Sequence, residues 1–357
     1  MSNKLSVAII YGGKSVEHQI SINSAKNIFE YIDRNKYDPI AIGISPAGDW
    51  VLKDRIDNQF DGQPQLALML STSNKGFKNL NNNEFIKPDI VFPVLHGTDG
   101  EDGSIQGLLK SMEIPFIGTG VLGSAISMSK LYTKRLLEAA GIPVSKYLTY
   151  DYPQKSEIKF EHVESTLGLP FMAKAANLGS SVGVVKVKSK ADFEKALDEA
   201  FKFDNTILFE QYITGRELEC SVMGNEAPEA SNPAEIVISK NYEFYTYEAK
   251  YLDPNAVELH VPAKVDDKTV AMIRALSVKA YKALSCDDFA RVDLFLTDSG
   301  EILINEINTI PGFTNSSMFP MMWQKRGISF TDLISKLINI ALKRESAAHR
   351  ITNQYQP

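Results

Sequence analysis

Four polar residues near the C-terminal end of the chain alternate with apolar residues in two adjacent segments: Arg291, Asp293, Glu306 and Asn308. If a two-residue loop joins the segments as a β-hairpin, Asp293 lies opposite Glu306 and Arg291 lies opposite Asn308. Residues two apart on a strand share a face, so the four side chains are expected to lie together. Two carboxylates about 5 Å apart across a ladder are destabilising unless positive charge lies between them. A hard cation such as Mg²⁺, which prefers oxygen ligands, would supply that charge.

The hairpin itself is predicted from the segments 290–297 (ARVDLFLT) and 301–308 (EILINEIN), which alternate apolar and polar positions. Asp298, Ser299 and Gly300 between them are typical turn residues, and Ser299 with Gly300 would form the two-residue loop. A three-residue loop would shift the register and separate the facing carboxylates. The alternative to a metal site is a solvated strand face with one Arg–Asp ion pair.

A second set of candidate residues has the composition of a phosphate-binding loop. Lys174 ends the predicted strand 171–174, and residues 177–183 (NLGSSVG) follow, including Ser180 and Ser181. Such a loop offers backbone N–H and hydroxyl donors, and the lysine adds a positive charge. The spacing is neither that of a P-loop nor that of a dinucleotide fingerprint. An ordinary glycine loop between strands is the alternative.

The predicted strand 206–213 (TILFEQYI) carries Glu210 near its end, and Glu217 follows a short turn. A strand edge with nearby carboxylates suits a nucleoside, because main-chain groups can bind the base and an acid can bind the ribose hydroxyls. A strand and turn with no ligand is the alternative. Residues 308–317, small and polar, could present N–H and hydroxyl donors to an anion, or could simply connect a strand to a helix.

Glu17 and His96 occupy positions where a binding site is expected. Residues 5–11 form an apolar run followed by Gly12 and Gly13 and then a helical pattern, which is the opening of a doubly wound α/β domain. Ligands of such sheets bind at the carboxyl ends of the strands. Glu17 follows the first strand and His96 ends another. Favourable interaction with a helix dipole and a structural histidine are the respective alternatives.

Length and composition limit the class of protein. The 357 residues are too many for one ordinary core, and 44% hydrophobic with 23% charged residues is typical of a soluble globular protein. The net charge of −6 gives no indication of nucleic-acid or anionic-membrane binding. The two cysteines form no metal or disulfide pattern, which fits a reducing cytoplasmic location. No segment approaches the roughly 20 apolar residues of a membrane span.

Three domains are predicted from the order of elements. Residues 1–126 read as an α/β substrate domain with a parallel sheet. Residues 127–210 read as a small α+β unit with mainly antiparallel strands, and residues 211–357 as a further α+β unit that contains the hairpin. The predicted fold class is therefore α/β combined with α+β.

Six motifs, in order and spacing, resemble those of the D-alanine–D-alanine ligase family. They are residues 11–18 (YGGKSVEH) with Ser21, 96–103 (HGTDGEDG), Lys174 with 179–183 (GSSVG), 248–251 (EAKY), 291–293 (RVD) and 306–312 (EINTIPG). The resemblance covers residues 6–342. It implies the three-domain ATP-grasp architecture, in which two α+β units clamp ATP and an N-terminal domain closes the substrate site.

The resemblance also implies a role for each matching residue. Metal ligation, of two Mg²⁺ ions that Mn²⁺ can replace, is implied for Asp293, Glu306 and Asn308. Binding of ATP is implied for Lys130, Lys174, Ser181, Glu210, Glu217 and Lys250. Catalysis, through substrate orientation and stabilisation of an oxyanion, is implied for Glu17, Ser180, Tyr251, Arg291 and Gly312. Contact with the amino acids is implied for His96 and Ser317. Ala175 and Ser129 depart from the family pattern at positions with no chemical role.

The implied activity is ATP-dependent joining of two D-alanines through an acyl phosphate, for peptidoglycan precursors, by a cytoplasmic homodimer. A D-alanine–D-lactate ligase is the nearest alternative, and Tyr251 argues against it because depsipeptide-forming relatives carry another residue there. Another ATP-grasp carboxylate–amine ligase is a second alternative, disfavoured by Glu17 and Ser317. A nucleotide-binding regulator without turnover is a third, which would be expected to lack some of the four hairpin residues.

Overall fold

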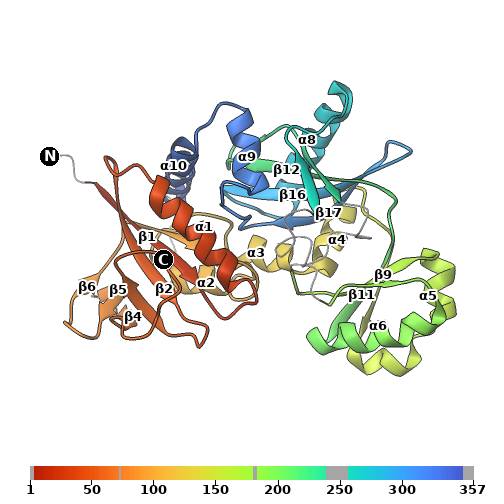
Figure 1. Ribbon diagram of the computed structural model, residues 1–357, viewed down its shortest axis with the longest axis horizontal. Coiled ribbons are helices and arrows are strands. Elements are labelled where there is room, and N and C mark those ends of the chain that lie inside the picture. The colour runs from red at the N-terminus through yellow and green to blue at the C-terminus, as the bar shows by residue number, and fades with distance from the viewer. Residues whose placement is uncertain (1–3, 72–73, 180–182, 239–255, 349–357) are drawn as a thin grey trace, which may run out of the picture.

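The computed structural model describes residues 4–71, 74–179, 183–238 and 256–348. Figure 1 shows an N-terminal region at the left, a C-terminal region at the upper right and a central region at the lower right. Each region is built around a β-sheet with helices packed on it. The predicted mixture of α/β and α+β units is confirmed, whereas the domain boundaries at 126/127 and 210/211 stay predictions.

The N-terminal sheet has the strand order β3-β2-β1-β7, with β1 parallel to both of its neighbours. Its elements are β1 (Leu5–Gly12), β2 (Tyr37–Ile44), β3 (Trp50–Lys53) and β7 (Ile90–Val94), with α1 (His18–Tyr31), α2 (Ser104–Ser111) and α3 (Val121–Met128). The predicted strand, glycine turn and helix at the start are confirmed. Gly12 has φ +92°, and a Cβ there would lie 2.3 Å from the Ile44 carbonyl oxygen, so the turn requires glycine.

A small antiparallel sheet beside it was not predicted from the sequence. It consists of β4 (Leu66–Ser71), β5 (Asn74–Asn79) and β6 (Phe85–Ile86). Strand β5 (NKGFKN) is rich in asparagine and lysine, which are depleted in strands generally, and β6 has only two residues, so the local pattern of these two strands is weak. Burial of Leu66 and Phe77 against the N-terminal sheet holds them in place.

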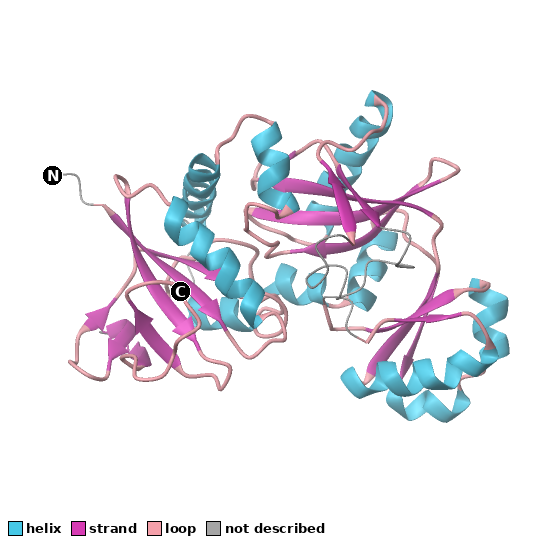
Figure 2. Ribbon diagram, viewed as in Figure 1, coloured by secondary structure: helices cyan, strands magenta, loops and turns pink. Residues whose placement is uncertain are grey.

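The central sheet is antiparallel, in the order β10-β9-β11-β8. Its elements are β8 (Tyr147–Asp151), β9 (Phe171–Ala175), β10 (Val185–Val187) and β11 (Thr206–Gln211), with the 3₁₀ turn η1 (Tyr152–Glu157), α5 (Phe160–Leu167) and α6 (Lys190–Phe203). The two α-helices cover the outer face of this sheet (Figure 2). Aromatic side chains of Phe171, Phe193 and Phe209 pack against one another in a core that belongs to this region alone.

The C-terminal sheet has the order β15-β14-β12-β16-β17, and β13 pairs with β12. Its strands are β12 (Gly215–Met223), β13 (Glu229–Ala230), β14 (Ala234–Ile238), β15 (Val257–His260), β16 (Phe289–Thr297) and β17 (Ile302–Asn308). Helices α4 (Lys130–Ala139), α8 (Asp267–Ala283) and α9 (Met318–Lys325) pack on this sheet, whereas α10 (Phe330–Ala348) packs on α9 and α1. None of the helices in the described ranges is long and apolar enough to span a membrane.

The predicted hairpin forms from β16 and β17, but its loop has three residues rather than two. Thr297 pairs with Glu301, and Gly300 takes φ +83° as the left-handed residue of the turn. Leu294 consequently pairs with Ile304, one residue out of the predicted register. Beyond that point Asn305 forms a β-bulge.

The bulge restores the register at the polar end of the hairpin. Asp293 pairs with Glu306 and Arg291 pairs with Asn308, as the sequence predicted. The prediction of a two-residue loop was therefore wrong, because Gly300 is used for a three-residue turn. The pairing of the four polar residues is nevertheless confirmed, since the extra residue in β17 compensates for the extra residue in the turn.

The N-terminal and C-terminal regions share one hydrophobic core. Val7 and Ile9 of β1 belong to the same buried cluster as Phe289, Phe313 and Trp323 from the C-terminal half. Helix α10, at the end of the described chain, contributes Leu333, Ile334, Leu337 and Ile338 to it. These two regions are consequently packed as one body, as their contact in Figure 1 suggests.

A buried ion pair reinforces that junction. Arg344 of α10 donates to Asp288 Oδ2 and to the Gly118 carbonyl, both at 2.7 Å, and to the Phe116 carbonyl at 2.7 Å. Asp288 is fully buried and also accepts from the Gly118 N–H at 2.8 Å and from the Asn225 amide at 2.9 Å. The two regions are thus joined by directed polar contacts as well as by apolar packing.

Candidate active site

Two cavities meet at the polar end of the β16–β17 hairpin. One, of about 340 Å³, opens toward the N-terminal region, and the other, of about 440 Å³, opens toward the central sheet. Both are lined by the same five residues, Lys130, Gly179, Glu219, Arg291 and Glu306. A group bound in one cavity can therefore react with a group bound in the other at the hairpin.

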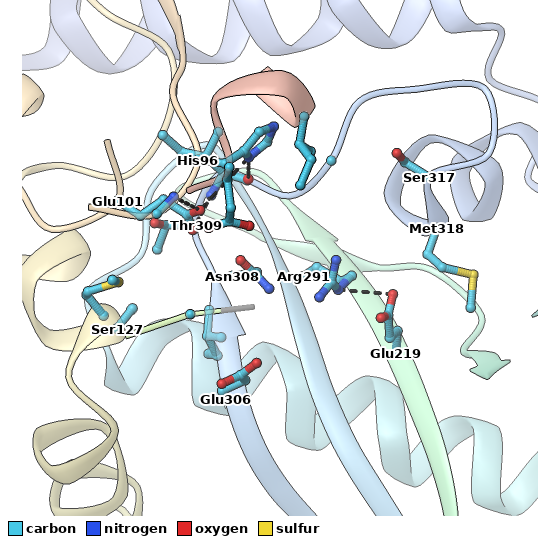
Figure 3. Close-up of a pocket in the computed structure, with 18 of the residues that line it drawn as sticks. His96, Glu101, Ser127, Glu219, Arg291, Glu306, Asn308, Thr309, Ser317 and Met318 are labelled. Atoms are coloured by element: carbon cyan, nitrogen blue, oxygen red, sulfur yellow. Dashed lines mark hydrogen bonds and ion pairs between the residues drawn. The ribbon is translucent and has the colours of Figure 1, made fainter. Parts of the chain in front are cut away.

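Arg291 is held in place by carboxylates on its own strand and on the neighbouring strand β12. Its Nε and Nη2 donate to the two oxygens of Asp293 at 2.7 and 2.6 Å, and Nε lies 3.0 Å from Glu219 Oε2 (Figure 3). Burial alone would lower the pKa of Arg291, but the charges of Asp293 and Glu219 outweigh it and raise the pKa further above its usual value. The guanidinium is fixed and charged at the point where the cavities join.

Asn308 connects this cluster to Glu101, which follows β7 in the N-terminal region. With its oxygen toward Arg291, the Asn308 amide accepts from Nη2 at 2.8 Å and donates to Glu101 Oε2 at 3.1 Å. Glu101 Oε1 accepts from the Gly97 N–H at 3.0 Å. Burial, together with the nearby charge of Glu17, raises the pKa of Glu101 to about 8. The Glu101 side chain thus links Asn308 of the hairpin to the 96–103 loop, and Figure 3 shows His96 and Glu101 of this loop above Asn308.

His96 ties the end of β7 to the loop after β17. Its Nδ1 donates to the Ile310 carbonyl at 2.8 Å, which leaves Nε2 to accept from Ser24 Oγ at 3.0 Å. Ser24 in turn accepts from the Phe313 N–H at 3.1 Å. Burial lowers the pKa of His96, so the imidazole is neutral in this arrangement. The histidine therefore lies in the wall of the first cavity and fixes residues 310–313 relative to α1.

Glu17, Gly312 and Ser317, three of the predicted site residues, also line the first cavity. Glu17 precedes α1 and is buried against the loop at Gly97, where a Cβ would lie 2.6 Å from Glu17 Oε2. A Cβ on Gly312 would lie 2.8 Å from Ser317 Oγ. Both glycines are needed for space, because any side chain would displace the polar group beside it.

The second cavity contains the predicted nucleotide residues that the structure describes. Lys130, Lys174, Glu210 and Glu217 all line it. Lys130 Nζ donates to the Leu178 carbonyl at 2.6 Å and lies 3.7 Å from Glu306 Oε2. Lys174 donates to Glu210 at 2.6 Å. Positive charge from α4 and β9 therefore faces the carboxylates of the hairpin, as a phosphate chain between them would require.

The hairpin residues suit Mg²⁺ when a phosphate completes the site. Among the described residues, no group of three His, Cys, Asp or Glu side chains is placed to hold a metal by itself. Asp293 and Glu306 face each other, and Asn308 shares the face of Glu306. Mg²⁺ is usually held by one or two carboxylates together with substrate phosphates and water, so this donor set fits the ion.

Four of the predicted site residues lie outside the described residues: Ser180, Ser181, Lys250 and Tyr251. Their roles stay predictions. The other predicted residues all line one or both of the two cavities. Residues from positions as distant as 17 and 317 are thus brought to one place.

Sequence reasoning assigned no role to Glu101 and overlooked Glu219. Glu101 lies within a motif that was noted, and its proximity to Asn308 depends on how two regions pack. Glu219 is two residues after Glu217 on β12, so alternation alone could have placed the two on one face. Its contact with Arg291 depends on the pairing of Glu219 with Asp293 across β12 and β16, which are far apart in the sequence.

Comparison with known families covers almost the whole chain. Residues 6–119 match the family described as D-ala D-ala ligase N-terminus, and residues 136–339 match D-ala D-ala ligase C-terminus. The chain is 45% identical over 353 residues to the D-alanine–D-alanine ligase of Oceanobacillus iheyensis, with 96% of each chain covered. It is also 45% identical over 356 residues to D-alanine–D-alanine ligase A of Salmonella typhimurium, covering 96% of this chain and 97% of that one.

Solved structures agree with this result. The D-alanine–D-alanine ligase of Coxiella burnetii superposes with a TM-score of 0.87 at 35% identity, over 98% of this chain and 97% of that one. The VanG D-Ala:D-Ser ligase of Enterococcus faecalis superposes with a TM-score of 0.86 at 35% identity, over 95% and 100%. The fold is therefore the ATP-grasp architecture, and the chain belongs to the D-alanine–D-alanine ligase family.

Proposed function

We propose that this protein joins two D-alanines into D-alanyl-D-alanine, with ATP converted to ADP and phosphate, to supply peptidoglycan precursors. The observation that carries the proposal is the meeting of two cavities at Arg291 and Glu306. A carboxylate must be activated before an amine can displace an oxygen from it. Adjacent cavities for a nucleotide and for two amino acids allow activation and displacement to occur at one position.

The first step transfers a phosphoryl group. A carboxylate oxygen of the first D-alanine forms a bond to the γ-phosphorus of ATP, and the bond from that phosphorus to ADP breaks. Lys130 and Lys174, which line the second cavity, would orient the phosphates, with Lys250 and the backbone around Ser181 as further expected donors. Bound Mg²⁺, held by Asp293, Glu306 and Asn308, would neutralise the phosphate charge. Glu210 and Glu217 would bind the adenine and ribose.

The second step forms the peptide bond. The free amine of the second D-alanine attacks the acyl carbonyl carbon, the bond from that carbon to the phosphate oxygen breaks, and inorganic phosphate leaves. Negative charge develops on the carbonyl oxygen during the attack. Arg291 and the Gly312 N–H line the cavity where this charge would form and would stabilise it.

The remaining residues of the first cavity orient the substrates. Glu17 would bind the ammonium group of the first D-alanine, with His96 in the same cavity wall, and Ser317 would bind the carboxylate of the second; all three line the first cavity, which supports these roles. Ser180 and Tyr251 are proposed to complete a hydrogen-bonded group with Glu17. None of these residues needs to form a covalent bond to the substrate.

A D-alanine–D-lactate ligase and a D-alanine–D-serine ligase are the alternatives within this fold, the latter because of the similarity to the Enterococcus enzyme. Tyr251 is our proposed determinant against D-lactate. Replacement of Tyr251 by Phe is expected to permit D-alanyl-D-lactate formation. If the variant forms only D-alanyl-D-alanine when both acceptors are present, Tyr251 does not have this role.

The proposed function is tested by measuring phosphate release from ATP with D-alanine, L-alanine, D-serine or no amino acid, and by identifying the products by mass spectrometry. We expect release with D-alanine and the dipeptide as its product. Equal release with L-alanine would overturn the substrate assignment. Removal of Mg²⁺ by a chelator is expected to abolish turnover. Gel filtration with light scattering tests the homodimer expected from the family.

A further inference from the structure

Lys134 is a buried lysine that the proposed chemistry does not use. It lies on α4, one turn after Lys130, and its side chain is 1% exposed. Its Nζ donates to Glu210 Oε1 at 2.7 Å and to Ser145 Oγ at 3.0 Å. Lysine is rarely fully buried, and desolvation of its charge is costly unless the charge is paired. The position of Lys134 therefore calls for an explanation beyond packing.

Glu210 is the common partner of two lysines. Its Oε1 binds Lys134 and also accepts from the Ser145 hydroxyl, while its Oε2 accepts from Lys174 at 2.6 Å. Glu210 is 2% exposed. Burial alone would raise its pKa, but the two lysines together hold the pKa well below its usual range, so the carboxylate is ionised. Burial lowers the pKa of the Lys134 ammonium, and the charge of Glu210 opposes that shift. One buried carboxylate thus serves as the partner of two lysines.

The three charges differ in their access to the nucleotide cavity. Lys174 and Glu210 line that cavity, whereas Lys134 lies behind Glu210 and is not among its lining residues. Helix α4 holds Lys134 there because Leu131 packs on the central sheet and Leu137 packs on the C-terminal region. Lys134 therefore cannot touch ATP and can act only through Glu210.

Lys174 has two possible partners in this arrangement, Glu210 and the phosphates of ATP. It is bonded to Glu210, yet it is also the lysine placed to orient the phosphates of ATP. If it were the sole counter-ion of a buried carboxylate, turning toward a phosphate would leave Glu210 without a positive partner. Breaking a buried pair in this way is strongly unfavourable. A second lysine that stays with Glu210 removes that penalty.

We infer that Lys134 is a positioning residue for ATP binding. It keeps Glu210 paired and fixed when Lys174 turns from Glu210 to the phosphates, and it leaves one unit of positive charge in the cluster available to them. This inference rests on the proposed function, because it assumes that the second cavity binds ATP. It predicts different roles for the two lysines. Lys174 contacts the nucleotide directly, and Lys134 affects the affinity for the nucleotide through Glu210.

The test is the variant Lys134→Met, which keeps the aliphatic volume and removes the charge. We expect KM for ATP and Kd for ADP to rise by about tenfold or more, the scale of a lost charge-assisted hydrogen bond. KM for D-alanine, and kcat at saturating ATP, should change by less than about threefold. A purely structural role for Lys134 would lower Tm without this selective change in nucleotide affinity.

Lys53→Met is the matched control. Lys53 lies on β3 in the N-terminal sheet, its side chain is 3% exposed, and it is paired with Asp57 at 2.7 Å. Its loss is expected to lower Tm while leaving KM for ATP unchanged. If Lys53→Met and Lys134→Met raise KM for ATP equally, or if Lys134→Met leaves it unchanged, the inference is overturned.

A second variant keeps the inference testable if Lys134→Met folds poorly. In Lys134→Met/Glu210→Gln the buried carboxylate is also removed, so Lys174 no longer has to leave Glu210 to reach the phosphates, and no buried carboxylate is left without a lysine. Starting from Glu210→Gln, the loss of Lys134 should change Kd for ADP by less than about twofold. A tenfold change in that background would show that Lys134 does not act through Glu210.

Failure of the inference can be distinguished from failure of the proposed function. If the unaltered protein binds ADP and releases phosphate with D-alanine, the function stands whatever the Lys134 variants do. If it binds no adenine nucleotide by calorimetry, both proposals are wrong.

Discussion

The N-terminal region meets the C-terminal region through a continuous apolar core, whereas the central sheet meets them across a charged cleft. Val7, Phe313 and Trp323 belong to one cluster that crosses the first junction, and Arg344 with Asp288 closes it. The central sheet has a separate aromatic core. Arg344 and Asp288 at the first junction bond to each other and line neither cavity, whereas Lys130, Lys174 and Glu217 in the cleft line the second cavity. The first junction is built for stability and the second for binding.

The largest expected effect is on the first junction. Arg344→Met leaves Asp288 buried without its positive partner, so the free energy of unfolding at pH 8 should fall by about 3–5 kcal/mol. KM for ATP at 20 °C should not change. Denaturant unfolding and steady-state kinetics measure the two quantities.

The adjacent residue on α10 provides the control for that prediction. Lys343 pairs with Glu226 at 3.0 Å, but both side chains are more than 70% exposed. Lys343→Met should cost less than about 1 kcal/mol. Equal losses in the two variants, or a selective rise in KM for ATP in Arg344→Met, would break the comparison between the junctions.

The next largest effect is expected in the cleft. Arg291→Lys keeps the positive charge but loses the planar fork that binds both oxygens of Asp293. We expect kcat to fall by about 10²-fold, the scale of one oxyanion donor, while the free energy of unfolding changes by about 1 kcal/mol or less. A loss of stability without a loss of kcat would show that Arg291 serves the fold instead.

A smaller effect is expected in the pH dependence of stability, because Asp288 at the first junction titrates near neutral pH. Burial raises the pKa of Asp288 from 3.8 to about 6, with Arg344 opposing the rise. A carboxyl whose folded-state pKa is raised binds more protons when folded, so its contribution to stability falls as pH rises through that range.

Without Arg344 the pKa of Asp288 should rise further. The destabilisation by Arg344→Met should therefore be about 2 kcal/mol smaller at pH 5 than at pH 8, since each pKa unit corresponds to about 1.4 kcal/mol. The measurement is urea unfolding of both proteins at the two pH values. A pH-independent difference would mean that Asp288 stays ionised in the variant.

The smallest effect is expected for Glu101→Gln, at the point where both regions contact the hairpin. Because the pKa of Glu101 is raised to about 8, the side chain is largely protonated at pH 7, and an amide resembles it closely. Unfolding free energy should change by about 1 kcal/mol or less and kcat by about threefold or less. A much larger loss of kcat would show that the ionised form of Glu101 is needed.

Much of this architecture could be predicted from local patterns. The strand, glycine turn and helix at residues 5–32 and the alternation in β16 and β17 identified the elements that carry Glu17, Arg291 and Glu306. These signals are local, because they depend on strand and helix periodicity and on turn residues. The family resemblance then supplied roles that periodicity alone could not.

What could not be predicted depends on contacts between distant segments. The bulge at Asn305 was not predicted, although Asn305 and Glu306 are consecutive polar residues and so interrupt the alternation of the strand. The contact of Glu219 with Arg291 requires the register of β12 against β16. Burial of Lys134 requires α4 to be packed between two regions, and a lysine at that position otherwise looks like a solvent-exposed helix residue.

The bulge in β17 also has a practical consequence for protein engineering. Residues 298–301 at the tip of the hairpin are exposed. The pairing of Asp293 with Glu306 and of Arg291 with Asn308 lies on the other side of the bulge at Asn305, where β16 also pairs with β12. The tip is thereby insulated from the catalytic end. A short peptide tag or a fluorophore attachment site inserted after Ser299 should leave turnover intact, which makes this tip a suitable position for a label.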